Sequence, residues 1–168
     1  MAKKVYPLAS NSEQELIIRK LLEMINTFPD LPPIVKSKGI AFYDLSPNTE
    51  CMAFASLDSA RIFSRYIGGS YIGQYKFRIA YRYSTKSFEE RISKQSLLST
   101  IGEWLQKDTI TRPDGTTFKL EAYPPLDTNK EICSIENTDR TVIIDKNNTG
   151  YEDSIIDCVL KYHVRKED

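Results

Sequence analysis

Apolar residues recur at steps of three and four between Glu13 and Thr27, which is the spacing of one face of a helix. Ser12 and Glu15 stand three residues apart near its start, as in a capping box that satisfies two backbone N–H groups. Several prolines follow directly and predict the end of the helix. The apolar face consists of Leu16, Ile17, Leu21, Met24, Ile25 and Phe28, and the prolines are Pro29, Pro32 and Pro33.

A second helical pattern runs from Phe88 to Lys107. Ser87 and Glu90 repeat the capping-box spacing at its start. Gly102 lies inside the pattern and lowers the helix propensity slightly. The apolar stripe consists of Phe88, Ile92, Leu98, Ile101, Trp104 and Leu105.

Strict alternation of side chains predicts a long strand from Gln74 to Tyr83. Alternation implies that one face packs on a core, while the other meets water or a partner. The inward set is Tyr75, Phe77, Ile79, Tyr81 and Tyr83, and the outward set is Gln74, Lys76, Arg78, Ala80 and Arg82. Further strands are predicted at 39–43, 51–55, 62–66, 118–123, 132–135, 141–144 and 154–164, separated by turns at 46–48, 67–70 and 113–115 and a loop at 147–150.

This order of helix, strands, helix and strands predicts one α+β domain that covers residues 1–168. The simplest arrangement is a mostly antiparallel sheet of about five to six strands, with the two helices packed on one face. The last hairpin is expected to return the C-terminal strand to this sheet. A chain of 168 residues is long enough to bury a core of this kind.

Composition and charge exclude several classes of protein. Lys plus Arg and Asp plus Glu are 23 each, so no whole-molecule field favours DNA or an anionic membrane. No apolar run is long enough to span a bilayer, and the start of the chain lacks the apolar region of a secretory signal. Cys51, Cys133 and Cys158 lie far apart, and we expect them to be reduced core residues without a disulfide or metal site.

The search for catalytic chemistry finds no complete set of residues. The single histidine, His163, lies near the end of the last strand, and no GxSxG elbow accompanies it. A pair of His163 with one of the three cysteines stays open from the sequence alone. The glycines between Gly68 and Gly73 do not open a helix, so we expect a turn and no nucleotide cofactor.

Charged and aromatic clusters are expected to be surface features. The acidic pairs Glu89–Glu90, Glu152–Asp153 and Glu167–Asp168 are predicted to be solvated. Cations interleave with aromatic residues between Tyr75 and Tyr83, a composition that also occurs in single-strand nucleic-acid platforms. The pleat separates the two kinds of side chain onto opposite faces, which favours a core face with a wet face behind it.

Five short motifs occur in a fixed order over more than half of the chain. They are Arg65-Tyr66-Ile67-Gly68-Gly69, Gln74-Tyr75-Lys76-Phe77, Ile101-Gly102-Glu103-Trp104-Leu105, Gly150-Tyr151 and Ile156-Asp157-Cys158-Val159-Leu160-Lys161-Tyr162. Together they resemble a family from phages of Gram-positive bacteria, described as tail terminators or minor capsid proteins. Some members carry an older label as chloramphenicol resistance proteins. His163 lacks the following aspartate that an acetyltransferase of that kind would have, and the stretch 109–148 is longer and more polar than the resemblance implies.

The resemblance implies a structural protein and not an enzyme. Such a subunit would form a homohexameric ring that caps the tail tube, stops tube polymerisation and provides the surface for head attachment. Its partners would be the tail tube protein, the head–tail connector protein and, as an option left open, the tail sheath protein. DNA would only pass through the lumen. The subunit would be assembled in the host cytoplasm and located in the virion, at the head–tail junction.

The hairpin from Ile62 to Tyr83 is our candidate interface, because sheet edges and polar strand faces suit contacts between subunits. The candidate contact residues are Tyr66, Gly68, Gly69, Tyr71, Lys76, Arg78 and Arg82. The polar loops predicted at 107–115 and 138–150 would face the tube or the connector. The alternatives are another head–tail connector (a stopper or an adaptor) and, in other classes, a small ligand-binding or enzymatic domain or a nucleic-acid binder.

Overall fold

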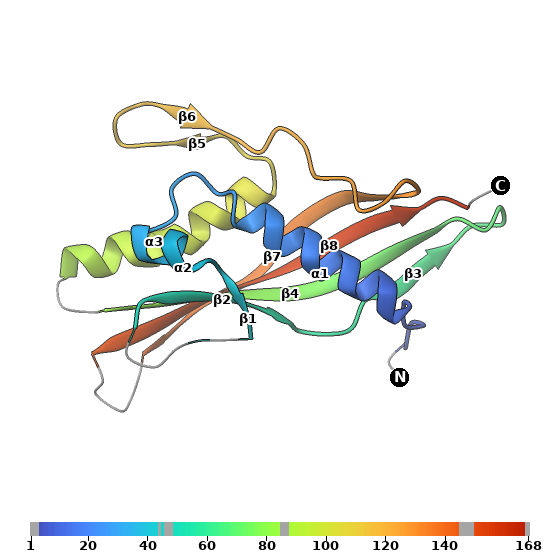
Figure 1. Cartoon of the computed structure of the whole chain (residues 1–168), viewed down its shortest axis with the longest axis horizontal. Helices are drawn as coiled ribbons and strands as arrows, with labels where there is room; N and C mark the ends of the chain where they lie inside the picture. Colours follow the sequence, from blue (N-terminus) through green and yellow to red (C-terminus); the bar gives the residue numbers. More distant parts are fainter. Residues whose placement is uncertain (1–3, 44, 46–48, 85–87, 145–149, 167–168) are drawn as a thin grey trace.

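The protein is an α+β fold with a six-stranded main sheet and a separate two-stranded hairpin (Figure 1). The computed structural model describes residues 4–43, 45, 49–84, 88–144 and 150–166. The elements, in chain order, are α1 (Asn11–Ile25), α2 (Pro33–Lys38), β1 (Ala41–Phe42), β2 (Cys51–Ser56), β3 (Arg61–Arg65), β4 (Tyr71–Ser84), α3 (Phe88–Leu105), β5 (Ile110–Thr111), β6 (Thr117–Phe118), β7 (Lys130–Ile144) and β8 (Tyr151–Val164).

The main sheet is ordered β1-β2-β4-β8-β7, and β3 pairs with the beginning of β4. Its pairs are antiparallel except for the short parallel pair of β1 with β2. β4 and β8 pair along their whole length, from Tyr71 opposite Val164 to Ser84 opposite Tyr151. This long central pair determines which residues of the two strands share a face. The predicted mostly antiparallel sheet is confirmed.

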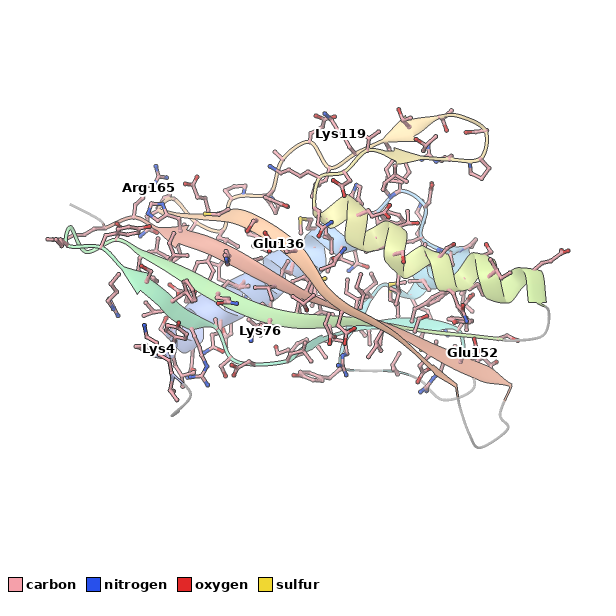
Figure 2. The ribbon with its side chains drawn as sticks, turned by 180° about the vertical axis from the view of Figure 1, so that it is seen from behind. Lys4, Lys76, Lys119, Glu136, Glu152 and Arg165 are labelled. Atoms are coloured by element: carbon pink, nitrogen blue, oxygen red, sulfur yellow. The ribbon has the colours of Figure 1, made fainter. Side chains whose placement is uncertain are left out.

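Both long helices cover the same face of the sheet. The predicted inward residues of β4 are at most 1% exposed, and apolar residues of α1 and α3 belong to the same core cluster. They are Tyr75, Phe77, Ile79, Tyr81 and Tyr83 from β4, Ile17, Leu21 and Ile25 from α1, and Leu98, Ile101 and Leu105 from α3. In the part of the chain that the structure describes, no helix lies over the opposite, outer face of the sheet. Figure 2 shows the molecule from behind, with this outer face toward the reader.

The start of α1 differs from the prediction. The N-cap is Ser10, whose Oγ accepts a hydrogen bond of 3.3 Å from the backbone N–H of Glu13. The predicted capping box of Ser12 and Glu15 is therefore wrong, because Ser12 already lies inside the helix. The short helix α2 was not predicted either; it begins at Pro33, whose fixed φ suits a first helical position.

The predicted strands 132–135 and 141–144 are parts of one strand, β7. The polar residues between them continue to pair with β8, with register shifts between Ile132 and Ser134 and between Asn137 and Asp139. β7 lies at the edge of the sheet, where polar residues and bulges are tolerated. Thr138 to Ile144 is therefore strand and not loop, and the strand predicted at 118–123 is limited to Thr117–Phe118.

Three side chains have a different burial from the one predicted. Ile92 of the predicted α3 stripe is 53% exposed, and Cys133, expected in the core, is exposed. Glu152, expected to be solvated, is 1% exposed, because the alternation of β8 directs it toward α3. The predicted turn at 46–48, Ser87 of the second capping box, most of the loop 147–150 and the final acidic pair lie outside the described residues.

Candidate interaction surface

The predicted contact residues follow one hairpin and do not converge on a cleft. They are Tyr66, Gly68 and Gly69 in the turn between β3 and β4, and Lys76, Arg78 and Arg82 on the outer face of β4. Tyr71 is different, because its hydroxyl donates to Glu13 Oε1 at 2.5 Å on the face that the helices cover. The candidate surface therefore consists of the hairpin turn and the outer face of β4, and Tyr71 belongs to the core side.

The two arginines of this surface are held by carboxylates of β8. Arg78 Nε donates to Asp157 Oδ1 at 2.7 Å, and its second nitrogen reaches Oδ2 at 3.0 Å. Arg82 binds Asp153 in the same bidentate way, at 2.7 and 2.8 Å. Each pair lies directly across the β4–β8 register. Bidentate pairs are strong and directional, so this part of the outer face is electrically neutral.

These ion pairs determine which substitutions can test the outer face as a contact surface. Glutamate in place of either arginine would set two carboxylates opposite each other and would destabilise the strand pair. The double substitution Arg78→Asp with Asp157→Arg keeps the ion pair and exchanges the positions of the positive and negative charges that a partner would contact. The sequence held a signal for the pairing. Arg78 and Arg82 are four residues apart on the predicted strand 74–83, and Asp153 and Asp157 have the same spacing, with Asp153 just before the predicted strand 154–164.

The hairpin turn carries two exposed apolar side chains. Tyr66 is 54% exposed and Ile67 is fully exposed. The turn is well formed, since Tyr66 N donates to Ser70 O at 2.9 Å and Gly69, at φ +94°, donates to Tyr66 O at 3.0 Å. Glycine suits this positive φ, which side-chain-bearing residues rarely adopt. Ile67 was not among the predicted contact residues, although it is next to Tyr66 in the turn and is the more exposed of the two side chains.

A shallow hollow lies beside the turn, and it brings together the histidine and one cysteine. Cys133 and His163 line it with Tyr66, Ser70 and Ile72. His163 Nδ1 is 3.7 Å from Glu131 Oε1, so the imidazole beside the thiol has a carboxylate neighbour. Partial desolvation of the thiol and the nearby Glu131 carboxylate raise the pKa of Cys133, whereas a nucleophilic cysteine needs a lowered pKa. This arrangement does not favour thiol catalysis.

The other two cysteines are buried. Burial raises the pKa of Cys158 to about 12, and its Sγ donates to Asn137 Oδ1 at 3.3 Å. Cys158 is therefore a neutral core thiol, as the apolar run around it predicts. Among the described residues, no group of His, Cys, Asp and Glu side chains is arranged to hold a metal ion.

Two buried carboxylates between the helices and the sheet, Glu13 and Glu152, were not predicted from the sequence. Glu13, in the first turn of α1, is buried and accepts from Tyr71 at 2.5 Å and from Tyr162 at 2.6 Å. The carboxylate of Glu152 accepts from Gln95 of α3 at 3.3 Å. These groups fasten the helices to the sheet through long-range hydrogen bonds, which the pattern of one element cannot reveal.

Buried tyrosine hydroxyls are expected to make the protein lose stability at high pH. Burial raises the pKa of Tyr81 and Tyr162 above the ordinary value of 10.0, and it raises the pKa of Tyr75 to about 12. Above pH 10 the unfolded chain releases these protons while the folded chain retains them, so the free energy of unfolding falls as pH rises. Urea unfolding and tyrosinate absorbance, measured together across this range, test the prediction. A complete tyrosinate signal with native circular dichroism would contradict it.

The comparisons with known proteins add no family to these observations. In the described part of the chain, no helix is long and apolar enough to cross a membrane. No protein-family model and no curated protein matches the chain.

Proposed function

We propose that this protein is a structural subunit of a phage tail terminator. It forms a homohexameric ring on the tail tube, stops further addition of tube subunits and offers the surface for head attachment. The observation that carries the proposal is the outer face of β4 and β8, which none of the described helices covers and which ends in the exposed turn of Tyr66 and Ile67. The sequence motifs that resemble tail terminators include this turn. The subunit then resides in the virion, at the head–tail junction.

The subunit presents two different contact features, the exposed turn and the outer face of β4 and β8, and this suits a ring. A ring of identical subunits needs a head-to-tail interface that closes on itself. The projecting turn supplies apolar anchors, and the outer face supplies a broad surface on which the arginines already have carboxylate partners. Ala80 opposite Ile155 lies between the two ion pairs. Such a face can be covered by a neighbour without leaving an arginine unpaired, which would be costly.

A second candidate is another head–tail connector, a stopper or an adaptor, which would use the same kind of surface against the portal side. Electron microscopy of particles made without this gene separates the two roles. Overlong tails without heads support the terminator. Tails of normal length beside detached, filled heads would assign the protein to head completion. Normal particles would refute both roles and leave a ligand- or nucleic-acid-binding domain as the next hypothesis.

Removing the apolar anchors of the turn is expected to prevent assembly without unfolding the subunit. Tyr66→Ser with Ile67→Ser changes two exposed side chains, so we expect a change in stability within about 0.5 kcal/mol. We expect the variant to fail to restore tails of normal length in the gene-deleted background, since exposed aromatic and aliphatic anchors contribute most to an interface. Complementation and microscopy measure this.

The control for the turn is Ile92→Ser, an apolar residue on α3 that is 53% exposed, close to the 54% of Tyr66. It is expected to restore normal tails, because it lies on a helix away from the hairpin. A turn variant that complements as well as this control would remove the turn from the interface.

A further inference from the structure

Three lysines gather at the corner where the N-terminal segment meets β3, β4 and β8, and we call Lys4, Lys76 and Lys161 the lysine corner. Figure 2 labels Lys4 and Lys76 at this corner. Lys4 Nζ stands 5.1 Å from the ring centroid of Tyr6, and Lys161 Nζ stands 5.7 Å from that of Phe63. The two rings pack against each other with centroids 5.0 Å apart. Lys4 and Lys161 therefore each lie over one ring of an aromatic pair.

The corner encloses a cavity of about 300 Å³. It is lined by Lys4, Val5, Tyr6, Asp58, Ser59, Arg61, Phe63, Gln74 and Lys76. Lys161 adjoins it, because it lies directly opposite Gln74 in the β4–β8 register. The lining combines apolar rings with cations, which suits a ligand that has both an apolar and an anionic part.

The charges of the corner are not balanced within the protein. Asp58 is the carboxylate of the cavity lining, and it pairs with Arg61, with Nε and Oδ2 3.0 Å apart, while Lys76 acts on it only at longer range. In the described part of the chain, no carboxylate lies within ion-pair distance of Lys4, Lys76 or Lys161. This contrasts with the arginines farther along β4, which both have aspartate partners. The lysine corner therefore retains an excess of positive charge beside an apolar cavity.

The shape of this charge favours an acidic peptide over a nucleic acid. A nucleic-acid backbone requires a stripe of cations that continues along the strand. Here the positive charge stops at the neutral Arg78–Asp157 pair on one side. On the side of β7, Lys76 and Glu136 both pair with Val159 of β8, so the carboxylate of Glu136 lies across β8 from Lys76 and limits the positive charge there. A short segment with two or three carboxylates matches the extent of the corner.

A second copy of this chain does not supply such a segment among the described residues. Adjacent carboxylates occur at Glu89–Glu90, which lies in the first turn of α3, and at Glu152–Asp153. Glu152 is buried, and Asp153 is held by Arg82. Neither of these described pairs forms an accessible extended segment, so the proposal takes a different protein as the partner.

We infer that the lysine corner is a docking site for a short, extended acidic segment of another protein, with an apolar side chain that enters the cavity against Tyr6 and Phe63. The carboxylates pair with Lys4, Lys76 and Lys161. Lys76 also belongs to the outer face proposed for the ring, but peptide binding is measured on the subunit without a ring, so its outcome is distinguishable from that of the assembly test.

Fluorescence anisotropy with a labelled peptide of alternating aspartate, leucine and glutamate tests the site on the full-length protein. The reference probes are the same peptide with asparagine and glutamine in place of the acids, and a labelled single-stranded oligonucleotide. We expect the acidic peptide to bind best and Lys76→Glu with Lys161→Glu to weaken it about tenfold or more, because two attractions become repulsions.

The matched control is Lys38→Glu with Lys119→Glu, which changes the net charge equally at exposed lysines elsewhere. It is expected to change the affinity less than twofold, and circular dichroism verifies that both variants fold. An equal loss in both variants, or equal binding of the neutral peptide, would overturn the site. Stronger binding of the oligonucleotide, with the same dependence on Lys76 and Lys161, would overturn it in favour of nucleic acid.

Discussion

Replacing Gly73 by alanine is expected to destabilise the protein by about 3 kcal/mol, the upper part of the range for overpacked cores. A Cβ atom at this position would lie 2.0 Å from the ring of Tyr162, which is wholly buried on the adjacent strand β8. The ring cannot move freely, because its hydroxyl is hydrogen-bonded to Glu13 of α1. A single added methyl group would therefore disturb both the central strand pair and the attachment of the first helix. Equilibrium unfolding in guanidinium chloride measures the loss.

Gly68→Ala is the matched control, five residues earlier and within the turn between β3 and β4. A Cβ at Gly68 meets nothing within 4 Å, so the variant is expected to stay within about 0.5 kcal/mol of the unmodified protein. If Gly73→Ala were as mild as Gly68→Ala, the ring of Tyr162 would not pack over Gly73. Combining Gly73→Ala with Tyr162→Leu should cost less than the sum of the two changes, because the second removes the atoms that the first disturbs.

Elements with a strong local period could be predicted from the sequence. The alternation of β4 correctly separated its core face from its outer face, because a pleated strand leaves each side chain only two directions. The apolar face of α1 was correct for the same kind of reason. The sheet architecture then followed, since helices with one apolar face must cover a sheet with one apolar face.

Features that depend on a neighbour far along the chain could not be predicted. Gly102 looked like a weak point in α3, but a Cβ there would lie 2.4 Å from Ile156 Cδ1, so the glycine permits close packing of the helix on β8. The polar middle of β7 looked like a loop, because an edge strand tolerates polar residues that a central strand would exclude. Ser10 was missed as the cap because Ser12 offered a similar local signal.

The candidate surface was predicted in part. Alternation placed Lys76, Arg78 and Arg82 on one outer face, as the structure has them. It could not reveal that Arg78 is paired with Asp157, which is 79 residues away, while Lys76 has no such partner among the described residues. The distinction between a neutral and a positive part of this face therefore comes from the strand register and not from the composition.

Replacing Glu13 by alanine is expected to cost about 3 kcal/mol, the upper end of the range for leaving a buried hydrogen-bond donor unsatisfied, because two hydroxyls lose their acceptor. Both oxygens of this carboxylate accept hydrogen bonds, one from Tyr71 and one from Tyr162. Without Glu13, the hydroxyl of Tyr162 would remain buried without its acceptor, and an orphaned buried donor costs about 1–3 kcal/mol by itself. Urea unfolding measures the loss, and hydrogen exchange of the α1 amides should increase before the sheet unfolds.

Glu15→Ala is the matched control, because Glu15 belongs to the same helix but is exposed. It is expected to cost less than about 1 kcal/mol, the usual contribution of an exposed carboxylate near a helix N-terminus. Tyr162→Phe should cost less than Glu13→Ala, since Tyr71 still binds the carboxylate. The double variant should be no less stable than Glu13→Ala alone, because the phenylalanine leaves no hydroxyl to be orphaned. Equal losses for Glu13→Ala and Glu15→Ala would mean that α1 is held on the sheet by its apolar face alone, through Ile17, Leu21 and Ile25.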